Sequence, residues 1–218
     1  MTVDVSLGYV PLVDAAPLII ADVLGFAEAE GLRFDLHRAA SWSMLRDMLD
    51  QGQVQAAHML SVVPVAQALG LGAGAARFEA SLVLSLGGQV IGLSDTVAQR
   101  LADLGYAFDF ATPATAAKAI AALGTTLRFG VPFPFSMQAL LVCYWLAALP
   151  EGRVSLRTIP PPMMPEALAS GEIDAFCVGE PWGSQAVQVA KARLILPGTA
   201  IWSRPPEKVL ATRLGWCD

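Results

Sequence analysis

Residues suited to acid–base or metal chemistry are scarce in this sequence. It holds only two histidines, His37 and His58, and three cysteines. Neither histidine has a second ligand at metal-site spacing, and the cysteines form no Cys-x-x-Cys pair. There is also no Gly-x-Ser-x-Gly elbow, no P-loop and no Gly-x-Gly-x-x-Gly turn. We therefore expect no catalytic centre, no metal site and no cofactor, and we interpret His58, which lies in an apolar run, as a core histidine.

Charge is equally limited. There are 14 basic and 19 acidic residues, a formal net charge of −5, and 55% of the chain is hydrophobic. The basic residues form no patch, which argues against direct nucleic-acid binding. Polar residues and a proline interrupt the apolar run over residues 54–76, so we expect no membrane insertion. The N-terminus shows no signal peptide, which predicts a cytoplasmic protein as written, or a periplasmic one if the N-terminus is incomplete.

One pattern of strands and helices occurs twice. Each copy opens with a strand that ends at a proline, Pro11 in the first and Pro132 in the second. A helix, a strand and a second helix follow, and a glycine (Gly52 or Gly171) ends that second helix before another strand. The proline and the glycine are 41 positions apart in the first copy and 39 in the second. Such alternation predicts an α/β protein of two lobes with parallel sheets.

The repeat also suggests where the lobes begin and end. We assign residues 1–90 to lobe 1, residues 91–194 to lobe 2 and residues 195–218 to a return toward lobe 1. In lobe 1, Asp14 is expected to be the N-cap of a helical run over residues 15–30. A further helix is expected to begin at Glu207, so the last part of lobe 1 should be missing from this chain.

Polar groups stand where strands end. In open α/β sheets, ligands sit beyond the carboxyl ends of the strands, so two lobes should enclose a cleft lined by these loops. These loops would supply donors for oxygen atoms from an indole N–H, amides, a hydroxyl and a backbone N–H. One lysine would add a positive charge, and the indole ring would form an aromatic wall. Such a set suits a small oxyanion better than a sugar or a hydrophobic ligand. The candidate ligand-binding residues are Trp42, Gln89, Ser136, Gln138, Gly179 and Lys208.

The most informative segment is Asp174-Ala-Phe-Cys-Val-Gly-Glu-Pro-Trp182. Its apolar residues predict a short buried strand that Gly179 ends, and Pro181 fits the first turn of a new helix. Backbone N–H groups at such a helix N-terminus can bind a small anion. An ordinary α/β turn with a tryptophan packed over it is the alternative interpretation.

This segment and others in the same order resemble the nitrate/bicarbonate-type solute-binding proteins of ABC transporters, including their cytoplasmic nitrate/nitrite sensors. The matching segments span essentially the whole chain and include Ala40-Ser-Trp42, Phe133-Pro-Phe-Ser136 and Pro206-Glu-Lys208. The resemblance implies a periplasmic-binding-protein-like (type II) fold that closes by a hinge and has a longer C-terminal part. It also implies these ligand contacts: Trp42, Gln89, Gln138, Gly179 and Lys208.

Gln138 departs from the family pattern, in which Thr-His follows Phe-Pro-Phe-Ser. A glutamine donates through its amide but carries no charge, so Lys208 is the one cation of the implied set. The ligand is thus open between nitrate, nitrite, another small oxyanion and a neutral solute.

Two functions follow from the resemblance. The first is a cytoplasmic sensor of nitrate assimilation, whose partner would be an RNA-binding antiterminator. The alternative is the substrate-binding component of a nitrate/bicarbonate-type ABC importer, with an ABC permease as partner. A related fold serves thiamine pyrimidine synthesis, but that chemistry uses a Cys-rich motif that this sequence lacks, so an enzyme is disfavoured.

Overall fold

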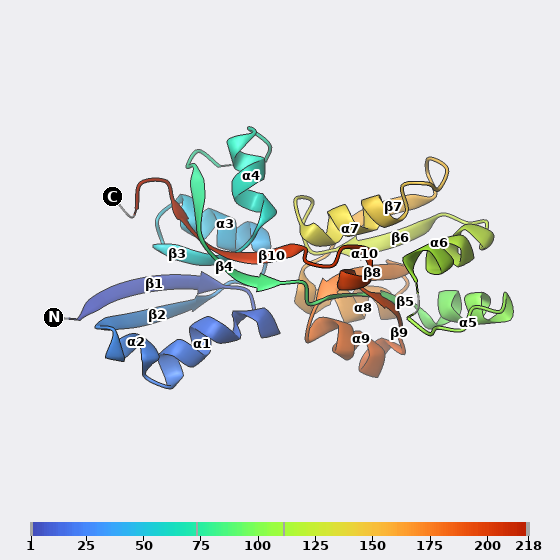
Figure 1. Ribbon diagram of the computed structural model, residues 1–218, viewed down its shortest axis with the longest axis horizontal. Coiled ribbons are helices and arrows are strands. Elements are labelled where there is room, and N and C mark those ends of the chain that lie inside the picture. Colours follow the sequence, from blue (N-terminus) through green and yellow to red (C-terminus); the bar gives the residue numbers. More distant parts are fainter. Residues whose placement is uncertain (1, 73, 111, 217–218) are drawn as a thin grey trace. The chain divides into compact units, whose positions relative to one another are not determined.

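The computed structural model describes residues 2–72, 74–110 and 112–216, which divide into two compact units. The first unit runs to Leu86 and resumes at Pro206, and the second is Gly87–Pro205. Each unit contains one five-stranded sheet (Figure 1). The boundaries expected at residues 90 and 194 thus lie at residues 86 and 205. The second boundary comes later than expected because the last strand and helix before Pro206 belong to the second unit.

The first unit surrounds a mixed sheet with the strand order β2-β1-β3-β10-β4. Strand β1 runs parallel to β2 and β3, whereas β10 is antiparallel to both of its neighbours. The elements are β1 (Val3–Tyr9), the 3-10 helix η1 (Val13–Ala15), α1 (Ala16–Val23), α2 (Phe26–Ala29), β2 (Leu32–Arg38), α3 (Trp42–Asp50), β3 (Ala56–Leu60), α4 (Val62–Ala68), β4 (Phe78–Leu86) and β10 (Pro206–Arg213).

Successive side chains of β1 meet helices on opposite faces of this sheet, as the period of a strand requires. Leu7 packs in one apolar cluster with Leu18 of α1. Gly8 faces α3, where a Cβ atom would overlap the Leu45 side chain. The missing side chain therefore allows α3 to approach the sheet closely.

The second unit repeats this layout with the strand order β7-β6-β8-β5-β9. Strand β6 is parallel to β7 and β8, and β5 is antiparallel to β8 and β9. The elements are β5 (Gln89–Leu93), α5 (Asp95–Asp103), α6 (Pro113–Ala122), β6 (Leu127–Val131), α7 (Met137–Trp145), β7 (Val154–Thr158), the 3-10 helix η2 (Pro161–Met163), α8 (Met164–Ala169), β8 (Ala175–Gly179), α9 (Trp182–Ala190), β9 (Arg193–Pro197) and α10 (Gly198–Ile201).

Helices cover both faces of β6, as they do in β1. Phe129 packs in the larger apolar cluster of the unit, together with Val142 of α7. Gly130 faces α8, where a Cβ atom would lie 2.5 Å from Met164 Sδ and 2.6 Å from Ile173 Cδ1. A glycine thus occupies the corresponding place in both units, which confirms the predicted repeat.

Two secondary-structure predictions for the ends of the chain were wrong. The segment from Glu207 is the strand β10 and not a helix, because it lies between β3 and β4 and pairs with both. The antiparallel strands β10 and β5 make both sheets mixed and not purely parallel. The helical run over residues 15–30 is interrupted at Gly25, whose φ of 74° lies in the left-handed region.

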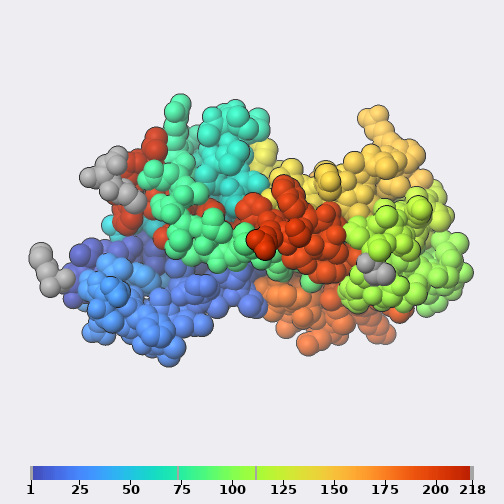
Figure 2. Space-filling model, viewed as in Figure 1, coloured from blue at the N-terminus to red at the C-terminus, as the bar shows by residue number. Residues whose placement is uncertain are grey.

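The surface of the first unit includes an apolar edge strand. Strand β4 ends the sheet, and Leu82, Val83 and Leu86 are each more than half exposed on it. Figure 2 shows this strand, in green, at the surface. In the described ranges, no helix has the length and apolar character needed to cross a bilayer.

A substitution at Gly130 tests the packing of the second unit. We expect Gly130→Ala to lower the free energy of unfolding by about 1–3 kcal/mol, because the added methyl group meets two buried side chains. Urea denaturation measures this. Arg157→Ala, an exposed position paired with Gly130 on β7, is the control and should stay within about 0.5 kcal/mol. An equally small effect of Gly130→Ala would contradict the close approach of α8.

Candidate functional site

The six predicted site residues divide between the two units. Trp42 and Lys208 belong to the first unit. The other four belong to the second unit and are Gln89, Ser136, Gln138 and Gly179.

Lys208 is the centre of the first half-site. It lies on β10 and its side chain is fully buried. Its Nζ atom lies 2.7 Å from Asp14 Oδ2 and donates a second hydrogen bond to Glu207 Oε1. Burial alone would lower the pKa of the lysine, but the two carboxylates outweigh it and raise that pKa. Lys208 therefore keeps its charge without contact with water.

Asp14 links the lysine to a histidine. Its Oδ1 atom lies 3.2 Å from His58 Nε2, while Oδ2 faces Lys208. Burial would raise the pKa of Asp14, but His58 and Lys208 lower it to about 2. Asp14 makes no helix-capping hydrogen bond, so its predicted role as an N-cap was wrong. It is a buried anion instead, because a long-range cation stabilises it more than a helix end would.

His58 is fully buried on β3, as predicted, but its neighbours are polar. Burial lowers the pKa of His58 and the charge of Lys208 adds to this, whereas Asp14 acts in the opposite sense. The imidazole is therefore neutral near pH 7. In the part of the chain that the structure describes, its Nδ1 atom has no hydrogen-bond partner.

Trp42 forms the aromatic wall of this half-site. Ser41 caps α3 by accepting a hydrogen bond from the Met44 amide, and Trp42 is the first residue of that helix. Lys208 Nζ lies 5.2 Å from the centroid of the indole ring, and the His58 ring lies 6.0 Å from it. Trp42 is 1% exposed, yet its Nε1 finds no acceptor among the described residues. A buried N–H without a partner costs about 1–3 kcal/mol, which a ligand oxygen would recover.

Together, Asp14, His58, Glu207 and Lys208 form what we call the buried charge cluster. Only Lys208 of these four was predicted as a site residue. An ionisable residue inside an apolar strand was the signal for His58, whereas the contacts of Asp14 depend on a partner far along the chain. Over residues 2–72, 74–110 and 112–216, no three His, Cys, Asp or Glu side chains are grouped to hold a metal ion.

In the second unit, Gln89 and Gly179 lie opposite each other on β5 and β8. Gln89 is buried, and a Cβ atom at Gly198 would lie 3.0 Å from its Oε1. Gly179 is the last residue of β8, and α9 begins only at Trp182. The predicted strand, glycine and helix therefore occur in this order, with a short turn between strand and helix.

Gln138 and Ser136 lie at the start of α7, which packs against β8. The Ser136 hydroxyl accepts a hydrogen bond from the Ala139 amide at 3.1 Å and so caps the helix. Its O–H remains able to donate. Gln138 lies in the first turn and is buried, so this half-site offers neutral donors only.

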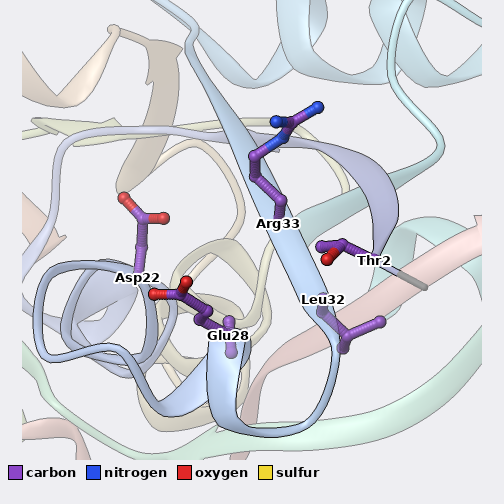
Figure 3. Close-up of a pocket in the computed structure, with 6 residues that line it drawn as sticks. Thr2, Asp22, Glu28, Leu32 and Arg33 are labelled. Carbon is purple, nitrogen blue, oxygen red and sulfur yellow. The ribbon is translucent and has the colours of Figure 1, made fainter.

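A separate hollow of about 260 Å³ lies elsewhere on the first unit, between the α1–α2 region and β2 (Figure 3). Asp22 and Glu28 line it on one side and Arg33 on the other. Arg33 is exposed and pairs with Asp4 at 2.7 Å. The hollow includes none of the predicted site residues, and we assign no function to it.

Comparison with known proteins agrees with this architecture. The model of the NMT1-like family matches residues 2–218. The chain belongs to this family. It is 34% identical over 225 residues to a nitrate import ATP-binding protein of Synechocystis. This alignment covers 99% of the chain and 32% of that protein. It is 32% identical over 225 residues to a nitrate/nitrite binding protein of Nostoc. That alignment covers 100% of the chain and 50% of the Nostoc protein.

Among solved structures, the periplasmic nitrate-binding protein from Synechocystis superposes with a TM-score of 0.84 at 30% identity. The match covers 100% of the chain and 57% of that structure. The alkanesulfonate-binding protein from Xanthomonas axonopodis shares the fold, with a TM-score of 0.69 at 17% identity over 98% of the chain and 66% of that structure. These findings confirm the predicted nitrate/bicarbonate-type solute-binding family and its periplasmic-binding-protein-like fold. The chain spans a third to a half of the curated relatives' length.

The lowered pKa of Asp14 predicts a pH-dependent contribution to stability. Its carboxylate should stabilise the fold by on the order of 2 kcal/mol above about pH 4, and this contribution should disappear as pH falls toward 2. Asp14→Asn should therefore lower the free energy of unfolding at pH 7 and approach the wild-type value in acid. Urea denaturation over a pH series measures the difference.

Asp4→Asn is the matched control for this series, since Asp4 pairs with Arg33 at the surface and should contribute little. A cost of Asp14→Asn that stays constant down to pH 2 would contradict His58 and Lys208 as the source of the pKa shift.

Proposed function

We propose that this chain binds a small oxyanion, such as nitrate or nitrite, as the substrate-binding component of a nitrate/bicarbonate-type ABC import system, and that it is not an enzyme. The observation that carries the proposal is the buried indole N–H of Trp42, which lacks an acceptor in the described residues and lies beside the cation Lys208. A donor and a positive charge next to each other suit an anionic oxygen.

The second half-site supports the same ligand class. Gln89, Gln138 and the backbone of Gly179 would supply neutral donors from strand and helix ends. Nitrate and nitrite carry only acceptor oxygens, which matches a site composed mainly of donors.

The relatives favour transport over sensing. One is named as a nitrate import ATP-binding protein and another as a nitrate/nitrite binding protein. A bicarbonate transport ATP-binding protein of Synechococcus elongatus is 35% identical over 99% of the chain and 32% of that protein. We therefore favour a permease-linked role. The sensor role, with an antiterminator partner and a cytoplasmic location, stays a prediction.

Removing one N–H group tests the role of Trp42. Trp42→Phe keeps an aromatic ring but loses the donor, so nitrate or nitrite affinity should fall about 10- to 100-fold, as for a lost hydrogen bond to a charged group. Calorimetry at fixed pH measures the affinity. Trp145→Phe is the matched control, because the Trp145 indole donates to Pro113 O within the second unit.

The control should lower the free energy of unfolding and leave anion affinity unchanged. Trp42→Phe should lower anion affinity and leave the free energy of unfolding nearly unchanged. Unchanged affinity in Trp42→Phe would remove Trp42 from the ligand site.

Restoring the family pattern tests position 138. Met137→Thr combined with Gln138→His places an imidazole in the first turn of α7, where it can become cationic below about pH 6.5. The double variant should bind nitrate more tightly than the wild type, and the ratio of the two affinities should increase toward low pH. A ratio near one from about pH 5.5 to about pH 8 would show that residue 138 does not contact the ligand.

A further inference from the structure

Helix α1 is apolar on its outer side as well as on the side that packs in the core. Leu18 belongs to the apolar cluster of the first sheet, whereas Ile20, Val23 and Leu24 are between 47% and 72% exposed. These three follow one another at helical spacing, so they lie on one side of α1. Phe26 opens the adjoining helix α2 and is 59% exposed. Single exposed apolar residues are normal, but a helix that is apolar all round is usually covered by another surface.

Unpaired carboxylates accompany these four residues, which we call the α1–α2 face. Asp22 lies in α1, Glu28 lies in α2, and Glu30 follows it; all three are exposed. Asp22 and Glu28 line the same hollow (Figure 3). Among the described residues, no ion pair includes any of these three acids. Residues 1–32 contain no lysine or arginine, and Arg33 is already paired with Asp4.

The charge of the α1–α2 face distinguishes between the surfaces that could cover it. A second copy of the chain, related by a two-fold axis, would bring two identical faces together, so that carboxylates would oppose carboxylates. An anionic membrane surface would repel the same groups. A protein segment that combines apolar side chains with lysine or arginine would match both the apolar residues and the carboxylates.

We propose that the α1–α2 face docks on the permease of the import system, through a permease segment in which basic residues flank apolar ones. The inference rests on the proposed function, which supplies the permease as a partner, and adds the surface that this partner contacts. The apolar residues would supply the buried area, and the carboxylates would orient the partner. The α1–α2 face includes none of the half-site residues, so substitutions can separate docking from anion binding.

Crosslinking identifies what covers the face. Benzoylphenylalanine takes the place of Val23, which at 72% is the most exposed of the four residues, in the full chain. Cells that carry the import system are then irradiated, and mass spectrometry identifies the attached molecule. A permease subunit supports the proposal. A second copy of the chain, an unrelated protein, a lipid or the absence of any adduct would overturn it.

Affinity for the permease, reconstituted with its ATPase in lipid nanodiscs, tests the apolar residues. Val23→Ser combined with Leu24→Ser should weaken docking about 10- to 100-fold, because both exposed contacts are lost. Val65→Ser combined with Leu69→Ser is the matched control. It removes an exposed valine and an exposed leucine at α4 of the same unit, a helix without acidic residues. The control should dock as the wild type does, and equal affinities of the two variants would overturn the assignment.

The salt dependence of docking tests the carboxylates. Docking of the wild type should weaken as ionic strength increases. Glu28→Gln combined with Glu30→Gln should dock more weakly at low salt and respond less to added salt. Glu151→Gln combined with Glu172→Gln, two exposed glutamates of the second unit, is the control and should respond as the wild type does. An unchanged salt response in the first variant would overturn the match to a basic segment.

Calorimetry with nitrate separates this inference from the proposed function. The variants of the α1–α2 face should keep the nitrate affinity of the wild type. A chain that binds nitrate or nitrite but does not dock through this face overturns the inference and leaves the proposed ligand intact. A chain that docks through this face but binds neither anion overturns the proposed ligand and supports the docking surface.

Discussion

The ion pair between Lys208 and Asp14 is the interaction on which the first unit depends. An ammonium group without contact with water is tolerated only when opposite charges compensate for its lost hydration. Asp14 supplies one such charge from η1, and Glu207 supplies another from β10 itself. The pair thereby joins the returning strand β10 to the N-terminal part of the sheet.

The same constraint shapes the site. A lysine held by two carboxylates cannot act as a free cation, so its attraction for an anion depends on the charge of the whole cluster. The Trp42 ring lies 5.2 Å from the ammonium group, and its indole N–H is the donor that we propose for the ligand.

Local signals in the sequence predicted much of the fold. Prolines and glycines at matching spacing revealed the two α/β copies, and Gly8 and Gly130 occupy corresponding places in the two sheets. The strand β10 was not predicted, because its partners β3 and β4 lie more than 100 residues earlier in the chain and override local preference. The role of Asp14 was missed for the same reason. Its spacing fits a helix cap, and only the tertiary contact with Lys208 reveals the buried ion pair.

A crystal structure of the chain with nitrate bound tests the central claim most directly. The account predicts one nitrate with an oxygen about 3 Å from Trp42 Nε1 and with Lys208 still paired to Asp14. Nitrate bound elsewhere, with the Trp42 indole N–H donating to a protein group instead, would contradict the account.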